Sequence, residues 1–226
     1  MLFVSFVAIS FPVIRALLLD AAGTLIDLAE PVGEVYARIL SRHGIELPAA
    51  ELERRFRRSF ATLPPPDFAR APTGDEAERA WWRSLVETAL DRPLADDAFA
   101  ALFDHYAQPE AWTVFPEVAE VLERARTLGW KLAVVSNFDR RLHAILAGHG
   151  LAGHFEAIIS SADAAARKPE PAIFHHALRQ LGVAPEQALH AGDSLPLDVE
   201  AAVSCGIRAI HIDRPLTTLR AVFEGS

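Results

Sequence analysis

Residues 15–27 read Arg15-Ala-Leu-Leu-Leu-Asp20-Ala-Ala-Gly-Thr-Leu-Ile-Asp27, and this stretch decides the fold of the chain. A short apolar run that ends in an aspartate and continues into Gly-Thr is typical of a buried strand in a parallel sheet. Open α/β sheets bind their ligands beyond the carboxyl ends of their strands. Asp20, which ends this run, is therefore the first candidate for a chemical role.

The composition favours a globular enzyme of the cytoplasm. The chain has 226 residues, 51% of them hydrophobic, which is enough to bury a full core. Its net charge is −8 and its basic residues are scattered, which argues against nucleic acid or an anionic membrane as a partner. The single cysteine, Cys205, excludes an internal disulfide framework and fits a reducing compartment.

Residues 1–13 are apolar and uncharged, which raises the question of a targeting segment. They lack the basic start and the cleavage site of a signal peptide, and they are shorter than the roughly 20 residues that span a bilayer. We interpret residues 1–13 as an N-terminal extension, disordered or lying against the first strand, that comes from an over-extended start site.

After Asp27 the pattern becomes helical and stays so until about Trp112. Pro31 and Pro48 each stand at a helix start, Gly44 ends the first helix, and Thr73 or Asp75 caps the third. The predicted helices cover residues 32–40, 48 to about 60, about 75 to 90, and 96–106. The sequence thus predicts an all-helical insertion directly after the first strand.

From Phe115 onward the pattern alternates between helix and strand, which predicts a parallel sheet with helices on both faces. The predicted helices are 116–128, 139–148, 171–181 and 197–204, and the predicted strands are 131–135, 157–160, 188–191 and 208–212. Polar residues follow three of these strands, namely Ser136-Asn137, Lys168-Pro169 and Gly192-Asp193-Ser194. Because the carboxyl ends of parallel strands share one edge, we expect these side chains to meet Asp20.

Four groups of residues, taken in this order, resemble the four motifs of the haloacid dehalogenase superfamily. They are Asp20-Ala-Ala-Gly-Thr, Ser136-Asn137, Lys168-Pro169 and the run from Gly192 to Asp198. The resemblance implies a Rossmann-like α/β core formed by residues 14–27 and 113–226, with residues 28–112 as an inserted α-helical cap of the first cap class. Three further stretches are similar to the rhythmically-expressed-gene-product-like branch of the superfamily. They are Pro31-Val-Gly-Glu-Val-Tyr, Trp81-Trp82 and the run from Ser136 to Leu142.

The resemblance also assigns roles to the residues at the strand ends. Asp20 would be the nucleophile that forms an aspartyl-phosphate, and Lys168 would neutralise charge on Asp20 and on the phosphate. Ser136 would donate to the phosphoryl oxygens, as would backbone N–H groups of Asn137 and of the turn from Ala21 through Gly23 to Thr24.

The same resemblance implies a Mg²⁺ site. Its ligands would be the carboxylates of Asp20 and Asp193 and the backbone carbonyl of Ala22, with Asp198 as a further or outer ligand. Water and a phosphate oxygen would complete the coordination sphere.

Ala22 departs from the pattern of the superfamily's phosphatases, which usually carry a second aspartate there as general acid and base. Loss of such a group typically lowers a rate by about 10²- to 10⁴-fold. Phosphonoacetaldehyde hydrolases resemble this chain in having alanine at that position, but they need a lysine in the cap. No lysine lies between Leu28 and Trp112.

Two functions remain open at this point. The first is a Mg²⁺-dependent phosphohydrolase for a small phosphorylated metabolite, slow or restricted to good leaving groups. The second is a catalytically weak or inactive homologue that binds phosphate or a partner protein in a regulatory role. A monomer and a weak homodimer are both compatible with the sequence.

Overall fold

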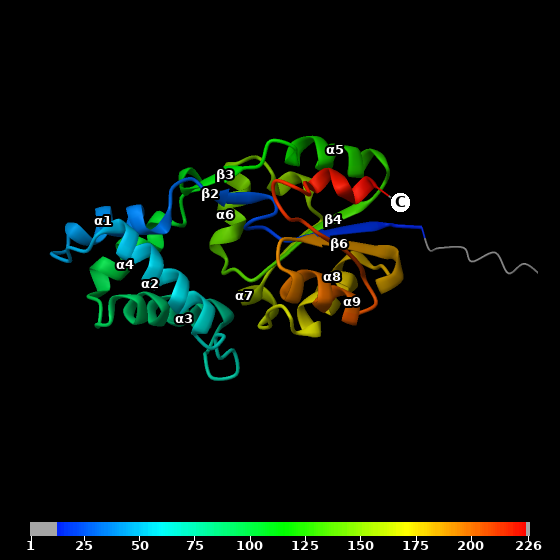
Figure 1. Ribbon diagram of the computed structural model, residues 1–226. Coiled ribbons are helices and arrows are strands. Elements are labelled where there is room, and N and C mark those ends of the chain that lie inside the picture. The colour runs from blue at the N-terminus through cyan, green and yellow to red at the C-terminus, as the bar shows by residue number, and fades with distance from the viewer. Residues whose placement is uncertain (1–12, 225–226) are drawn as a thin grey trace, which may run out of the picture.

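The computed structural model describes residues 13–224 and has two parts, a layered α/β core and a helical cap (Figure 1). The prediction for residues 1–12 therefore lies outside the described residues. No helix within 13–224 combines the length and the apolar character needed to cross a membrane.

A five-stranded sheet in the order β5-β4-β1-β6-β7 forms the core, and each pair of neighbours is parallel. The strands are β1 Ala16–Leu19, β4 Lys131–Ser136, β5 Ala157–Ser160, β6 Ala188–Gly192 and β7 Arg208–His211. The core helices are α5 Val118–Thr127, α6 Arg141–Gly148, α7 Ser161–Ala164, α8 Pro171–Leu181 and α9 Ala201–Ser204. The predicted α/β sheet is confirmed.

Strand β1 lies at the centre of the sheet and is buried on both faces. Leu17 and Leu19 pack into the hydrophobic cluster formed with α5 and α6, whereas Ala16 and Leu18 pack into the cluster formed with α8 and α9. Each buried leucine contributes about 2 kcal/mol of transfer free energy. This burial fixes the end of β1, and therefore Asp20, in the middle of the carboxyl edge.

Four helices form the cap, as the sequence predicts. They are α1 Val32–Ser41, α2 Ala49–Thr62, α3 Gly74–Leu90 and α4 Asp96–His105. Thr73 caps α3, since its hydroxyl accepts a hydrogen bond from the Glu76 N–H at 3.2 Å. The cap has its own apolar cluster, in which Tyr36 and Leu40 pack with Leu52, Val86 and Phe99.

A two-stranded antiparallel ribbon joins the cap to the core. Its strands are β2 Ile26–Leu28 and β3 Trp112–Val114, paired so that Ile26 faces Val114. Neither strand was predicted from the sequence, because three residues are too few to show a periodic pattern. The expected boundaries of the insertion at 27/28 and 112/113 fall inside this ribbon.

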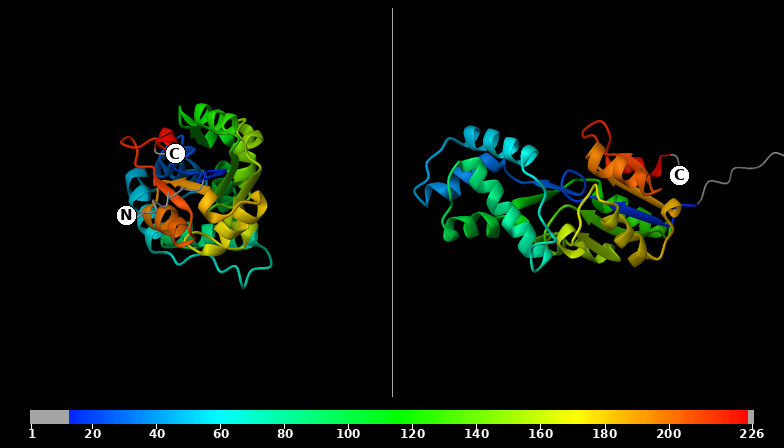
Figure 2. Two further views of the ribbon diagram at one scale, coloured as in Figure 1. Left: turned by 90° about the vertical axis from the view of Figure 1, so that its right-hand side faces the viewer. Right: turned by 90° about the horizontal axis from the view of Figure 1, so that it is seen from below.

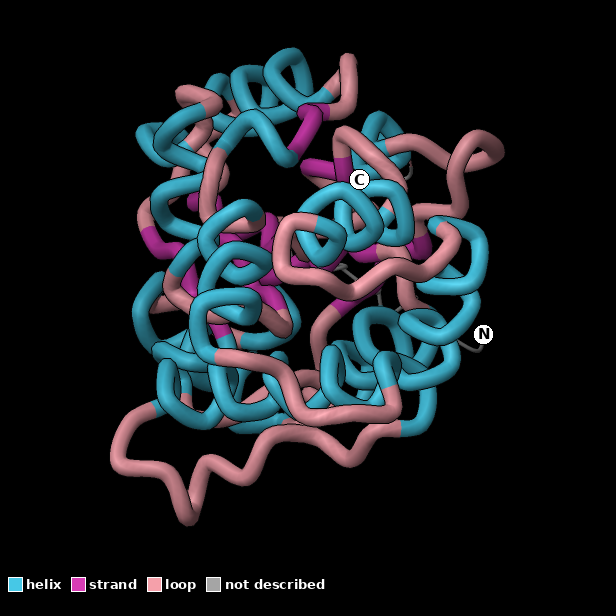
Figure 3. The backbone as a smooth tube through the Cα atoms, turned by 90° about the vertical axis from the view of Figure 1, so that its left-hand side faces the viewer, coloured by secondary structure: helices cyan, strands magenta, loops and turns pink. Residues whose placement is uncertain are grey.

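The cap also contacts the core through the N-terminal end of α3. Gly74 lies so close to α7 that a Cβ at this position would be 2.0 Å from the Ala162 carbonyl oxygen. Asp75 of α3 binds Arg140 of the core at 3.1 Å. The right-hand view of Figure 2 shows the cap helices at one end of the molecule, and Figure 3, which is seen from that end, shows them in front of the sheet.

Candidate functional site

Asp20 follows β1 directly and begins a tight loop. The carbonyl of Ala21 accepts hydrogen bonds from the N–H groups of Thr24, Leu25 and Ile26, which closes the loop. Gly23 has a φ of +83°, and a Cβ there would lie 2.4 Å from Asp193 Oδ2. The Gly-Thr of the sequence is therefore explained, because only glycine permits this loop to pack against Asp193.

The ammonium group of Lys168 lies between two buried carboxylates. Its Nζ donates to Asp20 Oδ1 at 2.6 Å and to Asp198 Oδ1 at 2.5 Å. Burial by itself lowers the pKa of Lys168, but the charges of Asp20 and Asp198 outweigh it and raise the pKa. Lys168 thus stays charged and holds Asp20 in place.

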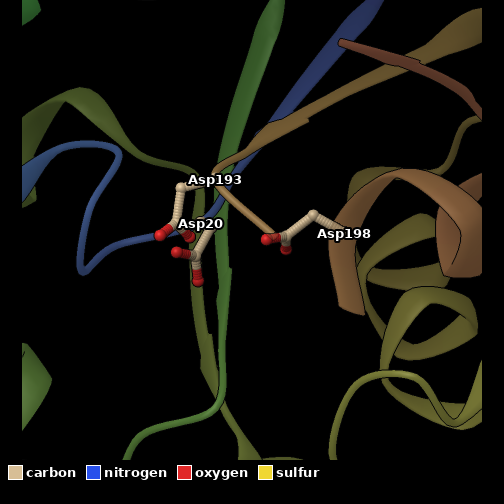
Figure 4. A group of neighbouring side chains, drawn as sticks. All are labelled: Asp20, Asp193 and Asp198. Carbon is tan, nitrogen blue, oxygen red and sulfur yellow. The ribbon is translucent and has the colours of Figure 1, made fainter. Parts of the chain in front are cut away.

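Asp193 completes an acidic cluster with Asp20 and Asp198. One oxygen from each carboxylate lies within 4.8 Å of the others, and Figure 4 shows the three side chains converging from different elements. Burial and the charges of Asp20 and Asp198 raise the pKa of Asp193 to about 6. Burial, together with the Asp198 charge, also raises the pKa of Asp20, although Lys168 opposes the rise.

The donor set of this cluster fits a hard divalent cation. Three carboxylates and one ammonium leave an excess of two negative charges, and oxygen ligands are those that Mg²⁺ prefers. The carbonyl oxygen of Ala22 accepts no backbone hydrogen bond from any described residue, so it is free to join them.

Both carboxylate oxygens of Asp198 take part in hydrogen bonds besides the one from Lys168. Its Oδ1 also lies 3.0 Å from His190 Nε2, and its Oδ2 accepts the Ser194 N–H at 3.0 Å. Burial raises its pKa, but Lys168 and His190 outweigh that effect and lower it below the usual range. The π-helix Leu195–Glu200 turns Asp198 back toward Lys168, where the sequence pattern predicted an ordinary helix from residue 197.

Asn137 has a role that sequence reasoning missed. Its side chain binds the backbone of Lys168 at both polar groups, accepting the N–H at 2.7 Å and donating to the carbonyl at 2.9 Å. Ser136, the last residue of β4, is buried, and none of the hydrogen bonds found within residues 13–224 involves its hydroxyl. Asn137 therefore positions Lys168, while Ser136 keeps a free donor.

The two loop residues predicted to bind substrate differ from each other. Gly23 lines the cavity described below, but its N–H donates to the Ile26 carbonyl at 2.7 Å. Thr24 is fully buried, its N–H donates to Ala21, and it is not among the residues that line the cavity. The N–H groups of these two residues are thus already used inside the loop.

The side chain missing at Ala22 has two candidate replacements close to the site in the sequence, Asp139 and Asp27. Asp139 is buried and forms a two-pronged ion pair with Arg141, with both contacts at 2.7 Å. Asp27 is exposed on β2 and lines the cavity described below, and its Oδ1 accepts the N–H of Leu28.

Glu78 is a buried acid of the cap that sequence reasoning missed. Its Oε1 lies 2.5 Å from Ser161 Oγ, which also lies 3.0 Å from the Phe138 carbonyl. Because a serine hydroxyl has one proton, both contacts are satisfied only when Glu78 is protonated and donates to Ser161. Burial raises the pKa of Glu78, in agreement with this geometry.

A cavity of about 900 Å³ connects the acidic cluster to the cap. The residues of the cluster and Lys168 line one end, and side chains of α1, α2, α3 and α4 line much of the rest, together with residues outside the cap helices such as Arg141, Arg167 and Glu170. The expected convergence of Asp20, Ser136, Asn137, Lys168, Asp193 and Asp198 on one edge of the sheet is observed. This arrangement can hold an anionic group and a cation beside the carboxylate of Asp20.

Comparison with known proteins agrees with this geometry. Residues 14–206 match the haloacid dehalogenase-like hydrolase family. Haloacid dehalogenase-like hydrolase domain-containing protein 3 of Danio rerio is 36% identical over 89% of this chain and 86% of its own length. The phosphoserine phosphatase of Thermus thermophilus is 32% identical over 89% of this chain and 90% of its own.

Two further comparisons bear on the branch and on the fold. The rhythmically expressed gene 2 protein of Drosophila melanogaster is 26% identical over 85% of this chain and 80% of its own length. The crystal structure of a phosphatase from Thermococcus onnurineus aligns with a TM-score of 0.67 at 28% identity, covering 93% of this chain and 97% of the other. The chain belongs to the haloacid dehalogenase-like hydrolases.

Proposed function

We propose that this protein is a Mg²⁺-dependent phosphohydrolase that acts on a small phosphorylated molecule through an aspartyl-phosphate on Asp20. The observation that carries the proposal is the position of Lys168, whose ammonium group bridges Asp20 and Asp198. A carboxylate that attacks a phosphate dianion must overcome charge repulsion, and an ammonium group held against it reduces that repulsion.

The residues of the chain would divide the reaction between them. Asp20 would attack phosphorus, forming a new O–P bond while the bond to the leaving oxygen breaks and its electron pair departs with the leaving group. Ser136 would donate its free hydroxyl to a phosphoryl oxygen, and Lys168 would offset the charge. Water would then attack phosphorus, which releases phosphate and regenerates the Asp20 carboxylate.

A bound Mg²⁺, held by Asp20, Asp193 and the Ala22 carbonyl, would neutralise the excess charge of the cluster and withdraw electrons from the phosphoryl group. Asp198 would serve mainly to fix Lys168, since its oxygens already accept three hydrogen bonds. We propose residues 28–112 as the cap domain that encloses the leaving group.

The methyl group of Ala22 cannot protonate a leaving group or activate water. We therefore propose that turnover is restricted to leaving groups that depart without a proton. The similarity to the phosphoserine phosphatase of Thermus thermophilus and to the phosphatase of Thermococcus onnurineus supports phosphoryl chemistry.

The test is turnover of acetyl phosphate, p-nitrophenyl phosphate and a set of sugar phosphates with and without Mg²⁺. We expect activity on the first two, and loss of that activity in Asp20→Asn and without the metal. Ala22→Asp should extend activity to alkyl phosphates. If the wild type equals Asp20→Asn on every substrate while Ala22→Asp gains activity, the natural protein is the inactive, ligand-binding homologue instead.

A further inference from the structure

The cavity next to Asp20 is much larger than a phosphate with a short alkyl chain requires. Its volume of about 900 Å³ lies in the range of sites for drug-sized molecules. Its cap side is lined by aromatic side chains from all four cap helices, among them Tyr36, Phe56, Phe60, Trp82, Phe103 and Tyr106. A substrate with a small or strongly hydrated leaving group would leave this surface without a partner.

The aromatic side chains form a continuous wall rather than isolated contacts. The ring of Phe56 lies 5.7 Å from that of Tyr36 and 5.9 Å from that of Phe60, and Phe60 contacts both Trp81 and Trp82. Tyr36 also lies 6.4 Å from Tyr106. Flat faces and edges at these spacings suit another aromatic ring.

Two charged groups beside the aromatic wall are neutralised by their neighbours. Arg141 pairs with Asp139 and lies over the ring of Phe103 at 3.6 Å, and Glu78 is hydrogen-bonded to Ser161. The other charged residues of the cavity, among them Arg167 and Glu170, come from outside the cap helices. A sugar would need a polar partner for each hydroxyl group that it buries, and this wall offers few of them.

Ala22 gives an independent reason for the same class of leaving group. The loop that carries Asp20 presents a methyl group there, so the leaving oxygen departs as an anion. A phenol has a pKa of about 10, as in tyrosine, whereas an alkyl alcohol resembles water at about 15.7. A phenolate therefore leaves far more readily without an acid than an alkoxide does.

We infer that the substrate of this site is an aryl phosphomonoester whose aromatic leaving group occupies the cap cavity. This inference rests on the proposed phosphohydrolase function. The Asp20 oxygen forms a bond to phosphorus as the phosphorus–aryloxy bond breaks, and the aryloxide takes its proton from water. A second water then cleaves the aspartyl-phosphate, so that ester and water give phenol and inorganic phosphate.

The experiment compares phenyl phosphate with 2-naphthyl phosphate, whose leaving groups have similar basicity but different size. Acetyl phosphate, small and activated, reports on the phosphohydrolase function alone. The second ring adds four carbons, and their burial predicts a kcat/KM for the naphthyl ester at least about tenfold above that for the phenyl ester. 2-Naphthol should also inhibit competitively at concentrations where phenol does not.

Phe56→Ala should reduce the naphthyl-to-phenyl ratio toward one. Phe68→Ala is the matched control, since Phe68 is a cap phenylalanine outside the residues that line the cavity, and it should leave the ratio unchanged. Thermal unfolding of each variant checks that it is folded, and Phe56→Leu replaces Phe56→Ala if the alanine variant is not.

The outcomes separate the two claims. Acetyl phosphate hydrolysis that depends on Asp20, together with a naphthyl-to-phenyl ratio of one or less, would overturn the aryl inference and leave the phosphohydrolase proposal intact. Absence of Asp20-dependent turnover on all three substrates would overturn both.

Discussion

Replacing Lys168 with methionine tests the electrostatic balance of the site. The substitution keeps most of the side-chain volume but removes the ammonium group that donates to Asp20 at 2.6 Å and to Asp198 at 2.5 Å. Breaking a buried ion pair by removing one partner typically costs about 3–5 kcal/mol, because a charge is left buried without compensation. We expect Lys168→Met to lower the free energy of unfolding by about this amount at pH 7 in EDTA.

The loss should depend on pH in a defined direction. Without Lys168, burial and the charge of Asp198 keep the folded-state pKa of Asp20 above its unfolded value, and Asp198 loses the ammonium charge that lowers its pKa. A carboxyl group with a raised folded-state pKa stabilises the folded protein below its unfolded pKa, and this stabilisation is lost as pH rises above that value. The difference in the free energy of unfolding between wild type and Lys168→Met should therefore be largest near pH 7–8 and should decrease toward pH 4.

Urea denaturation between pH 4 and pH 8 measures this difference, and the chain supplies a matched control in its only other lysine. Lys131 is half-buried and donates one hydrogen bond, to the Leu181 carbonyl at 2.6 Å. Lys131→Met should cost about 1 kcal/mol, with no such pH trend. If Lys168→Met is as stable as Lys131→Met at pH 7, or if its deficit does not change with pH, Lys168 does not compensate the buried carboxylates.

Three further predictions concern residues around the site. Asn137→Ala removes two hydrogen bonds to the backbone of Lys168. It should lower the free energy of unfolding in urea by about 1–3 kcal/mol and remove most of the phosphatase activity. Full activity of this variant would show that Lys168 needs no such support. The pKa of Asp163 is lowered to about 2, because hydrogen bonds from His143 and other side chains outweigh the effect of burial. Ionised Asp163 should therefore add about 1–2 kcal/mol to the free energy of unfolding at pH 7, and this contribution should be lost as pH falls from about 4 to 2. Asp163→Asn should lack this pH dependence in acid titrations of stability. Glu78→Gln should gain stability relative to wild type as pH rises from about 4 to 8, because burial favours the neutral acid. If the difference in unfolding temperature between variant and wild type does not change with pH, Glu78 is not protonated.

The sequence predicted the parts of the site that depend on strand ends. Asp20, Ser136 and Asp193 lie at the ends of apolar strands, and a parallel sheet brings such positions to one edge whatever the details of packing. Lys168 lies farther from its strand, beyond the short helix α7 that follows β5. The cap helices were equally accessible, because proline, glycine and capping residues mark their ends.

The parts that were missed depend on contacts between distant residues. The hydrogen bonds from Asn137 to Lys168 join residues 31 apart, and Glu78 meets Ser161 across 83 residues. His190 reads as one more residue of an apolar strand until Asp198 is placed beside it at 3.0 Å. Local pattern carries no information about such pairs, and the same holds for the short strands β2 and β3.

The most direct test of the account is the covalent state of Asp20 during turnover. The enzyme is mixed with acetyl phosphate and Mg²⁺, quenched in acid within the first turnovers and analysed by peptide mass spectrometry. We predict one phosphoryl group on the peptide that contains Asp20, absent in Asp20→Asn, and lower in occupancy in Ala22→Asp because a second acid speeds hydrolysis of the intermediate. Continued turnover with no phosphoryl group on Asp20 would contradict the central claim.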